Sequence, residues 1–567
     1  MLPPGISRES TEVDAAVARL REAAPGWSRA PLRDRIALAH ALADGVARTA
    51  ARAVQLACEA KRIDPASPVA GEEWTTGPYV TLRILRQLAR SLEELRRRGT
   101  TPIGRLGEAP DGRLTARVFP MGTMDRLLFP GLEAEVHLEA GVGPTEFHES
   151  RGRFHLRPDH AGRVCLVLGD GNVNAIPATD VLTKLFNEGK VCLLKLNPVN
   201  AYLAPVLREA FAPAIARGLV ALVDGDAGVG AELCRHPGVD EIHVTGSDRT
   251  HDLIVWGPPG PERDARRARG APLLDKPITS ELGNVTPVLV VPGGWDERSL
   301  AFQAEGVAGM VAHNGSFNCI AAKMLVTPRG WPLRARFLDL VMAALARTPA
   351  RWAFYPGAAA RHRALAEGRT DRRSTGGGEE GTLPWTLLPG LDPASADPAF
   401  TTEPFCSILS EVSVGSDDPA EFLDAAVRFA NERLWGTLAA TILVHPRVAR
   451  DPSHQAALQR AIRALRYGTV TIDTWAGVAF ALGTTPWGAY PGSTLADVQS
   501  GRGVVHDTLM LDRVEKCVLH HPAVAFPKPL FFPSHRTAHR VGERLVALEG
   551  RGGIAALPGV VAAAVRG

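Results

Sequence analysis

The central part of the sequence alternates between short apolar runs and helical segments, and this alternation limits the folds open to the chain. The apolar runs have the length of strands and cover residues 164–168, 191–196, 219–223 and 241–244. Strands joined by single helices pair in parallel with right-handed crossovers. We therefore predict a doubly wound, Rossmann-like sheet with a ligand at the carboxyl ends of its strands. The glycine-rich segment 225–230 is by itself a weak nucleotide-binding signal.

A second α/β run lies further along the chain, and helices and an alternating stretch precede the first. The predicted segments are, in chain order, helices within 11–98, a β-hairpin at 133–156, a strand at 288–291, a helix at 300–312, a strand at 324–327 and a helix at 333–346. The chain is therefore predicted to have an α/β fold with two large units.

One cysteine of the second run lies in a polar turn between a helix and a strand. The stretch Asn314–Cys319 reads NGSFNC, and such a turn can expose a thiol with backbone N–H groups pointing at it. Upstream, Glu281 precedes a Gly-Asn turn and an apolar strand. A lone cysteine is most often an inert core residue and a lone glutamate a solvated charge. Together, they are the minimum for covalent catalysis followed by base-assisted hydrolysis.

The composition excludes several classes of partner. The 567 residues are 45% hydrophobic with a net charge of +3, which is typical of a globular protein and indicates no nucleic-acid partner. No apolar run is long enough to span a bilayer, and no signal peptide is visible. The seven cysteines have neither CxxC nor zinc spacing, and His535 and His539, four residues apart, have no third ligand nearby. We expect a cytoplasmic protein without a metal site.

The two stretches together resemble the NAD(P)-dependent aldehyde dehydrogenase superfamily, whose pattern is Glu-Leu-Gly-Gly followed by Asn-x-Gly-Gln-x-Cys. The matching positions are Glu281, Leu282, Gly283, Asn314 and Cys319, and the last two keep their spacing. The departures are Asn284 for the second glycine, and Ser316 and Phe317 for the Gly-Gln pair. The resemblance covers roughly residues 15–520 and implies the fold of that superfamily.

The resemblance also implies a site for NAD or NADP. Its residues are Lys195 at the adenine ribose, Gly230, Gly246 and Ser247 near the pyrophosphate, and Glu403 and Phe405 at the nicotinamide ribose and ring. Relatives that prefer NAD often have a glutamate three residues after the lysine, where this chain has Pro198. Because proline has no negative charge to repel a 2′-phosphate, we expect NADP to be accepted.

The activity implied by the resemblance is oxidation of an aldehyde to a carboxylic acid. Cys319 would attack the carbonyl, Asn172 and the Cys319 N–H would hold the oxyanion, and Glu281 would activate the water that hydrolyses the thioester. Two alternatives stay open. One is a CoA-acylating dehydrogenase or acyl-CoA reductase on the same fold, whose members typically replace the glutamate. The other is a catalytically silent scaffold protein.

The resemblance divides the chain into parts. They are a Rossmann-like cofactor-binding domain (1–134 and 158–280), a catalytic domain (281–505), bridging and oligomerisation strands (135–157 and 506–525) and a C-terminal extension (526–567). The bridging strands would expose sheet edges, so we expect a homodimer or a homotetramer. A helix predicted at 538–548 packs either on its own subunit or on a neighbour. Surface loops are expected at 257–271 and 367–382.

Overall fold

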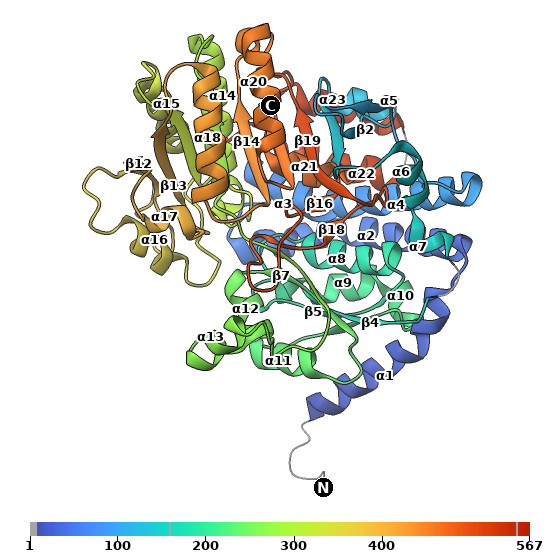
Figure 1. Cartoon of the computed structure of the whole chain (residues 1–567). Coiled ribbons are helices and arrows are strands. Elements are labelled where there is room, and N and C mark those ends of the chain that lie inside the picture. The colour runs from blue at the N-terminus through green and yellow to red at the C-terminus, as the bar shows by residue number, and fades with distance from the viewer. Residues whose placement is uncertain (1–7, 158–159, 552–553) are drawn as a thin grey trace.

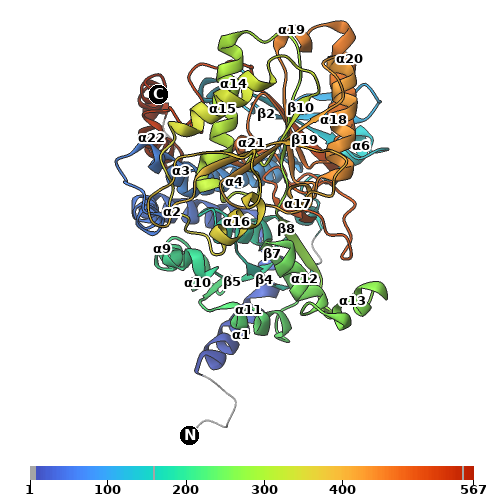
Figure 2. The same ribbon diagram turned by 90° about the vertical axis from the view of Figure 1, so that its left-hand side faces the viewer.

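Two large β-sheets organise the computed structural model, which describes residues 8–157, 160–551 and 554–567. The smaller sheet has six strands in the order β17-β8-β7-β4-β5-β6, and it occupies the lower half of the molecule in Figure 1. The larger sheet has eleven strands in the order β1-β2-β3-β19-β15-β14-β9-β10-β13-β12-β11, and β16 (Trp487–Gly488) pairs with β18 (Val504–His506) separately. Helices lie on both sides of the sheets (Figures 1 and 2). The predicted α/β class is confirmed.

The smaller sheet is parallel except for β17 and is almost entirely buried, which explains why its strands read as continuous apolar runs. Its strands are β4 (Val164–Leu168), β5 (Val191–Lys195), β6 (Val220–Val223), β7 (Glu241–Gly246), β8 (Ile278–Leu282) and β17 (Gly501–Arg502). Its helices are α8 (Ile176–Leu182), α9 (Ala204–Ala210), α10 (Ala212–Ala216), α11 (Ala227–Arg235), α12 (Asp248–Trp256) and α13 (Pro261–Ala268).

The larger sheet has a parallel centre and antiparallel strands at both ends. Its strands are β1 (Leu106–Glu108), β2 (Leu114–Phe119), β3 (Glu133–Leu138), β9 (Pro287–Val290), β10 (Met324–Pro328), β11 (Arg373–Thr375), β12 (Trp385–Leu391), β13 (Ile408–Val414), β14 (Ala439–Leu443), β15 (Thr469–Ile472) and β19 (Val514–His520). The helices that cover it include α14 (Glu297–Ala312), α15 (Arg334–Ala346), α18 (Pro419–Arg433), α20 (Pro452–Ala464) and α21 (Ala476–Leu482).

The C-terminal extension packs on its own chain. Its helices, α22 (Ala538–Arg551) and α23 (Leu557–Ala564), share a hydrophobic core with the N-terminal helices α1 (Arg8–Ser28), α2 (Leu32–Lys61) and α4 (Val80–Arg98). The backbones of α22 and α3 (Gly71–Trp74) approach closely, because a Cβ on Gly71 would collide with Ala538 and one on Gly542 with Trp74. The sequence left open whether the helix predicted at 538–548 packs on its own subunit or on a neighbour, and the structure shows it packed on its own chain.

Three predictions of local structure were wrong. Only the first strand of the predicted hairpin exists, as β3. Residues 144–150 and 153–156 form α6 (Pro144–Ser150) and α7 (Arg153–Leu156), because Pro144 is fixed in the φ range of a first helical residue. The predicted loop at 257–271 contains α13, which has acidic residues in its first turn and arginines in its last, as the helix dipole favours. The predicted loop at 367–382 contains β11, which pairs with β12.

The bridging strands do not expose the edges that the sequence analysis assumed. β3 lies between β2 and β19, and β19 lies between β3 and β15. The exposed strand at this end of the sheet is β1, whose three residues are all exposed. Residues 106–119, which we had grouped with the cofactor-binding part, therefore form strands of the larger sheet.

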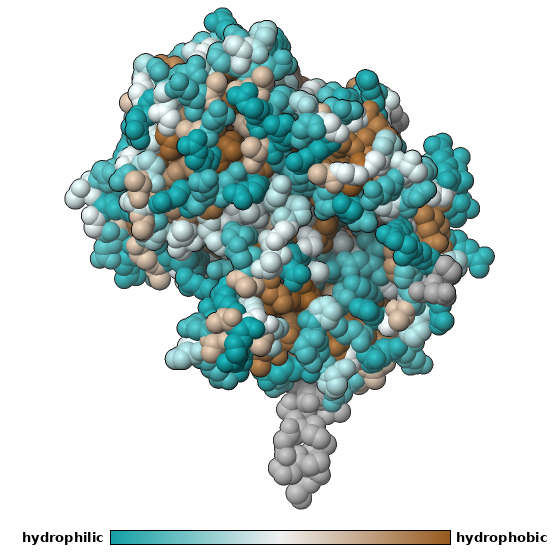
Figure 3. Space-filling view, viewed as in Figure 1, coloured by the Kyte–Doolittle hydropathy of each residue, from teal (hydrophilic) through white to brown (hydrophobic). Residues whose placement is uncertain are grey.

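Within the described ranges, no helix is both long and apolar enough to cross a bilayer. The face in Figure 3 is mostly hydrophilic, and its apolar side chains lie mainly in hollows.

Candidate active site

The predicted carboxylate lies in strand β8, just before the segment that joins the two sheets. β8 ends at Leu282 and β9 begins at Pro287, so Glu281 lies at the carboxyl end of β8. Asn172 follows β4, and Cys319 lies between α14 and β10. All three residues line one cleft of about 1440 Å³. The predicted catalytic residues are therefore brought together where a doubly wound sheet usually binds its ligand.

A left-handed backbone turn presents the cysteine to this cleft. Asn314, Gly315 and Ser316 have φ values of 55°, 65° and 71°, a region that side chains other than glycine and asparagine rarely adopt. The turn reverses the chain after α14. Cys319 is half-buried, whereas the other six cysteines are buried, among them Cys165 and Cys192, as expected. Cys319 is thus the one thiol of the chain that is partly accessible.

The carboxyl group of Glu281 is buried beside this thiol. Glu281 is 2% exposed, and burial raises its pKa to about 8, against a hydrogen bond with Cys319 that lowers it. Burial, and then the charge of Glu281, raise the pKa of Cys319 well above its ordinary value. A carboxyl group with a pKa near neutrality can exchange a proton with the thiol or with water.

Asn172 holds the nucleophile turn from the opposite side. Its side-chain amide donates a hydrogen bond to the carbonyl oxygen of Phe317 at 3.0 Å, and its Oδ1 accepts one from the N–H of Val173 at 2.8 Å. No described residue accepts the second N–H of that amide. A ligand oxygen bound near Cys319 could therefore receive it.

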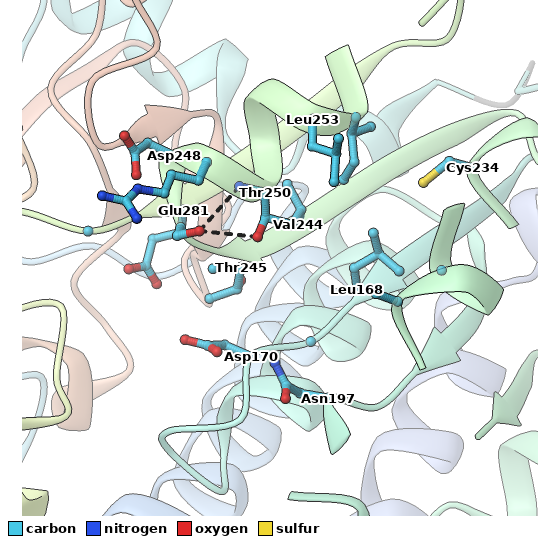
Figure 4. Close-up of a pocket in the computed structure, with 18 of the residues that line it drawn as sticks. Leu168, Asp170, Asn197, Cys234, Val244, Thr245, Asp248, Thr250, Leu253 and Glu281 are labelled. Carbon is cyan, nitrogen blue, oxygen red and sulfur yellow. Dashed lines mark hydrogen bonds between the residues drawn. The ribbon is translucent and has the colours of Figure 1, made fainter. Parts of the chain in front are cut away.

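The residues assigned to the cofactor line the same cleft. Lys195 ends β5, Gly230 lies in α11, and Gly246 ends β7. Ser247 begins α12, where its hydroxyl accepts a hydrogen bond from the N–H of Thr250 at 3.2 Å. Glu403 and Phe405 follow α17 (Pro398–Thr401). In Figure 4, Asp170 and Glu281 lie apart from Leu168, Leu253 and Cys234, which line another part of the cleft.

Lys323 is a buried cation beneath the nucleophile turn, and the sequence analysis missed it. It is 1% exposed. Its ammonium donates hydrogen bonds to the carbonyl oxygens of Cys319 at 2.9 Å and Asn284 at 3.0 Å, and it pairs with the carboxylate of Glu403. Its positive charge lowers the pKa of Cys319. A lysine at the entrance of a buried strand, four residues after the cysteine, was a signal that could have been used.

Lys61 ties the nucleophile turn to the turn of Asn172. At the end of α2, its ammonium pairs with Glu73 at 2.9 Å and donates hydrogen bonds to Asn314 Oδ1 at 2.9 Å and to the Asn172 carbonyl oxygen at 3.3 Å. The Asn314 amide donates to the carbonyl oxygens of Asn172 at 2.8 Å and Phe317 at 3.0 Å. These partners lie far apart in the sequence, so no local pattern could have predicted them.

Tyr355 closes the wall of the cleft next to the nucleophile turn. Its hydroxyl donates a hydrogen bond to Asp170 Oδ1 at 2.7 Å, and burial raises the pKa of Asp170 to about 6. The Tyr355 ring lies 4.8 Å from that of Phe405 and 5.9 Å from that of Phe317, measured between centroids. Among the residues that the structure describes, no group of three side chains is arranged to hold a metal ion.

The fold and the site define an α/β protein in which a cysteine, a carboxylate and an amide line one cleft beside a Rossmann-like sheet. No family model matches the chain. A protein of Staphylococcus haemolyticus whose name describes an aldehyde dehydrogenase is 28% identical over 185 residues, or 32% of this chain. The match spans about a third of that relative's length, 35%.

Solved structures match over most of the chain. An indole-3-acetaldehyde dehydrogenase in complex with NAD+ has a TM-score of 0.60 at 19% identity, over 90% of this chain and 89% of that one. An NADP-dependent glyceraldehyde-3-phosphate dehydrogenase from Bacillus halodurans, complexed with NADP, has a TM-score of 0.58 at 19% identity. The match covers 90% of this chain and 91% of that one. A γ-glutamyl-γ-aminobutyraldehyde dehydrogenase from Burkholderia cenocepacia has a TM-score of 0.60 at 20% identity. The match covers 90% of this chain and 88% of that one. The chain has the fold of the NAD(P)-dependent aldehyde dehydrogenase superfamily, and the resemblance inferred from the sequence is confirmed.

Proposed function

We propose that the protein oxidises an aldehyde to a carboxylic acid with NAD or NADP. The observation that carries this proposal is the meeting of Cys319, Glu281 and Asn172 in the cleft that also holds every residue assigned to the cofactor. In this proposal residues 158–280 contribute most of the cofactor site and residues 281–505 most of the chemistry.

The cleft suits a dinucleotide. Lys195 is buried, 7% exposed, yet no described residue accepts a hydrogen bond from its ammonium or pairs with it. Since Lys195 lines the cleft, its ammonium is open to a ligand that binds there. A ribose hydroxyl or a phosphate at this position would satisfy Lys195, and the N–H groups at the start of α12 would face a pyrophosphate. The bound cofactor supplies a nicotinamide ring that accepts a hydride.

The residues of the chain perform the remaining steps. Cys319 gives its proton to Glu281, and its sulfur forms a bond to the aldehyde carbon. The Asn172 amide and the Cys319 N–H stabilise the oxygen anion. Loss of the hydride leaves a thioester on Cys319. Glu281 passes the proton that it took from Cys319 to solvent and then removes a proton from water, whose oxygen attacks the thioester carbon. The carbon–sulfur bond breaks, the carboxylic acid is released, and Cys319 leaves as a thiolate that Glu281 can reprotonate.

The two alternatives make different use of Glu281. In a CoA-acylating enzyme the thioester passes to a thiol and needs no hydrolytic base, whereas here a carboxyl group whose pKa is raised by burial lines the same cleft as the nucleophile. A silent scaffold would have no need to keep Lys195 buried and without a partner. We therefore favour hydrolysis.

The test is a panel of aldehydes assayed with NAD and with NADP, in the presence and absence of CoA, by the absorbance of the reduced cofactor. We expect oxidation that CoA does not accelerate and one equivalent of acid for each hydride. Turnover that requires CoA would support the acylating alternative, and no turnover with any aldehyde would support the scaffold.

We also propose that the protein works in the cytoplasm as a homodimer or homotetramer. This part of the proposal rests on the resemblance and on the exposed edge strand β1. Light scattering at working concentration measures it, and a monomer would contradict it.

A further inference from the structure

We propose that Asp170 selects the oxidised form of the cofactor, because its carboxylate lies in the part of the cleft that the nicotinamide ring must occupy. This inference rests on the proposed function and adds a specificity-determining residue to its cofactor site. Asp170 follows β4 shortly after the strand ends, lines the cleft and is 6% exposed. No step of the proposed reaction uses it.

One carboxylate oxygen of Asp170 is held by the protein, and the other is open to the cleft. Oδ1 accepts hydrogen bonds from the N–H of Gly171 at 2.6 Å and from the hydroxyl of Tyr355 at 2.7 Å. No described residue donates to Oδ2. The backbone is fixed as well, since the Asn200 amide donates to the Asp170 carbonyl oxygen at 2.8 Å. Asp170 is therefore a firmly held carboxylate with one acceptor left for a ligand.

The neighbours of Asp170 place it at the end of the cleft where the reaction takes place. The ring of Tyr355 lies 4.8 Å from that of Phe405, which is assigned to the nicotinamide ring. The charge of Asp170 contributes to the raised pKa of Glu281, and Figure 4 shows both carboxyl groups extending toward the same side of the cleft. The hydride leaves a carbon bonded to Cys319, so the ring that accepts it must lie at this end too.

The cations near this end of the cleft already have other partners. Lys323 pairs with Glu403, and Arg361 donates hydrogen bonds to two backbone carbonyl oxygens, each at 3.0 Å. In the described part of the chain, no lysine or arginine pairs with Asp170. Burial raises the pKa of Asp170 to about 6, so the carboxyl group is ionised at pH 7. An ionised carboxylate that is buried without a cation is stabilised when a positive charge binds beside it.

The two forms of the cofactor differ in such a charge. The oxidised nicotinamide ring is positively charged, and it becomes neutral when it gains a hydrogen and two electrons as a hydride. The phosphates, riboses and adenine are the same in both forms, so any repulsion between Asp170 and the phosphates cancels when the two are compared. Asp170 should therefore favour binding of the oxidised form before the reaction and release of the reduced form after it, a step that limits turnover in many enzymes.

The test measures binding alone. Isothermal titration calorimetry gives the Kd of NADP and of NADPH, and of NAD and NADH, without aldehyde at pH 7. At this pH Asp170, with a pKa of about 6, is ionised, and Glu281, with a pKa of about 8, is mostly protonated. Asp170→Asn keeps the shape of the side chain and removes its charge. We expect the ratio of the reduced-form Kd to the oxidised-form Kd to fall about tenfold, mainly through weaker binding of the oxidised form.

Asp275→Asn is the matched control, since Asp275 also lines the cleft but is exposed and lies beside Lys276. Its ratio should stay within about twofold of the wild-type ratio, because exposed charges interact weakly. Tyr355→Phe keeps the charge of Asp170 and removes the hydrogen bond that holds it, so we expect an intermediate fall of about threefold. If Asp170→Asn does not fold, Tyr355→Phe decides. A ratio equal to that of the wild type in the folded variants of Asp170 and Tyr355 would overturn the inference.

The same titrations, combined with the aldehyde assay, separate this inference from the proposed function. Oxidation of aldehydes together with equal ratios in the wild type and all variants overturns the inference alone. The expected change of the ratio without oxidation of any aldehyde overturns the proposed function alone. Failure of the wild type to bind either form of NAD or NADP overturns both.

Discussion

The large cleft and the rear cavity, a second cavity of about 260 Å³ lined by residues of both the C-terminal extension and the main body, are built differently. The cleft contains ionisable groups, among them Glu281 and Lys195, which are buried at the ends of strands, and Glu403, which is half-buried after α17. The rear cavity is lined mainly by apolar and aromatic side chains from helices and from the extension. Charge development in a reaction needs preorganised charges, whereas recognition of a chain needs only apolar area. We expect substitutions of the ionisable groups in the cleft to change reaction rates.

Removal of the nucleophile should have the largest effect and should affect all aldehydes alike. In Cys319→Ala no thioester can form, so we expect kcat to fall by at least about 10⁴-fold, with cofactor affinity near that of the wild type. The measurements are initial rates with short and long aldehydes and a titration with reduced cofactor. Cys165→Ala, in the core of the smaller sheet, is the control. Substantial turnover by Cys319→Ala would show that another residue is the nucleophile.

Loss of Glu281 removes both the acceptor of the Cys319 proton and the hydrolytic base. Attack should suffer less than hydrolysis, because the charge of Glu281, which raises the pKa of Cys319, is lost with it. In Glu281→Gln we expect a burst of reduced cofactor followed by steady turnover about 10²–10⁴-fold slower than in the wild type. Because only the ionised carboxylate is a base, wild-type steady turnover should rise as the pH increases through about 8, the pKa of Glu281, and then level off. That rise should be absent from the glutamine variant. Unchanged steady turnover that CoA accelerates would contradict the assignment.

Lys323 should have an intermediate effect, because it acts on the nucleophile through its charge. In Lys323→Met the thiolate loses a nearby cation and Glu403 loses its partner. We expect alkylation of Cys319 by iodoacetamide at pH 8 to slow about tenfold, because a nearby cation favours the thiolate, and Tm to fall because the half-buried carboxylate of Glu403 is left unpaired. Lys323→Arg keeps the charge and should recover part of the alkylation rate. An alkylation profile equal to that of the wild type would mean that Lys323 only holds the backbone.

The same contrast explains how much the sequence could reveal. Cys319, Glu281 and Asn172 were predicted because they match the motif spacing of the family that the sequence resembles. Glu281 and Asn172 lie at the carboxyl edge of the smaller sheet, whereas Cys319 precedes a strand of the larger sheet. Lys61 and the rear cavity were not, because their contacts join segments that are distant in the chain. The predicted hairpin at 133–156 was wrong because the prediction rested on the alternation of apolar and polar residues. It did not account for Pro144, which begins a helix.

The smallest effect that we expect concerns the choice between the two cofactors, and it sharpens the description of the cleft. Pro198 lines the cleft beside Lys195, where it brings no carboxylate to repel a 2′-phosphate. The acidic group whose charge acts on Lys195 is Asp226. Its Oδ1 accepts hydrogen bonds from the N–H groups of Gly228 at 2.8 Å and Val229 at 3.2 Å, so it caps its own helix.

Asp226→Asn keeps an oxygen for this cap and removes the charge. We therefore expect the wild type to accept NADP, and the variant to shift the ratio of kcat/KM for NADP to kcat/KM for NAD toward NADP by about threefold to tenfold, the size of one weak charge interaction of about 1 kcal/mol. The measurement compares both cofactors with one good aldehyde. Ser247 lies elsewhere in the cleft, at the start of α12, so Ser247→Ala should weaken both cofactors alike and serves as the control. A wild-type preference for NAD of more than about a hundredfold, some 2.7 kcal/mol, that Asp226→Asn does not relieve would mean that another carboxylate faces the ribose.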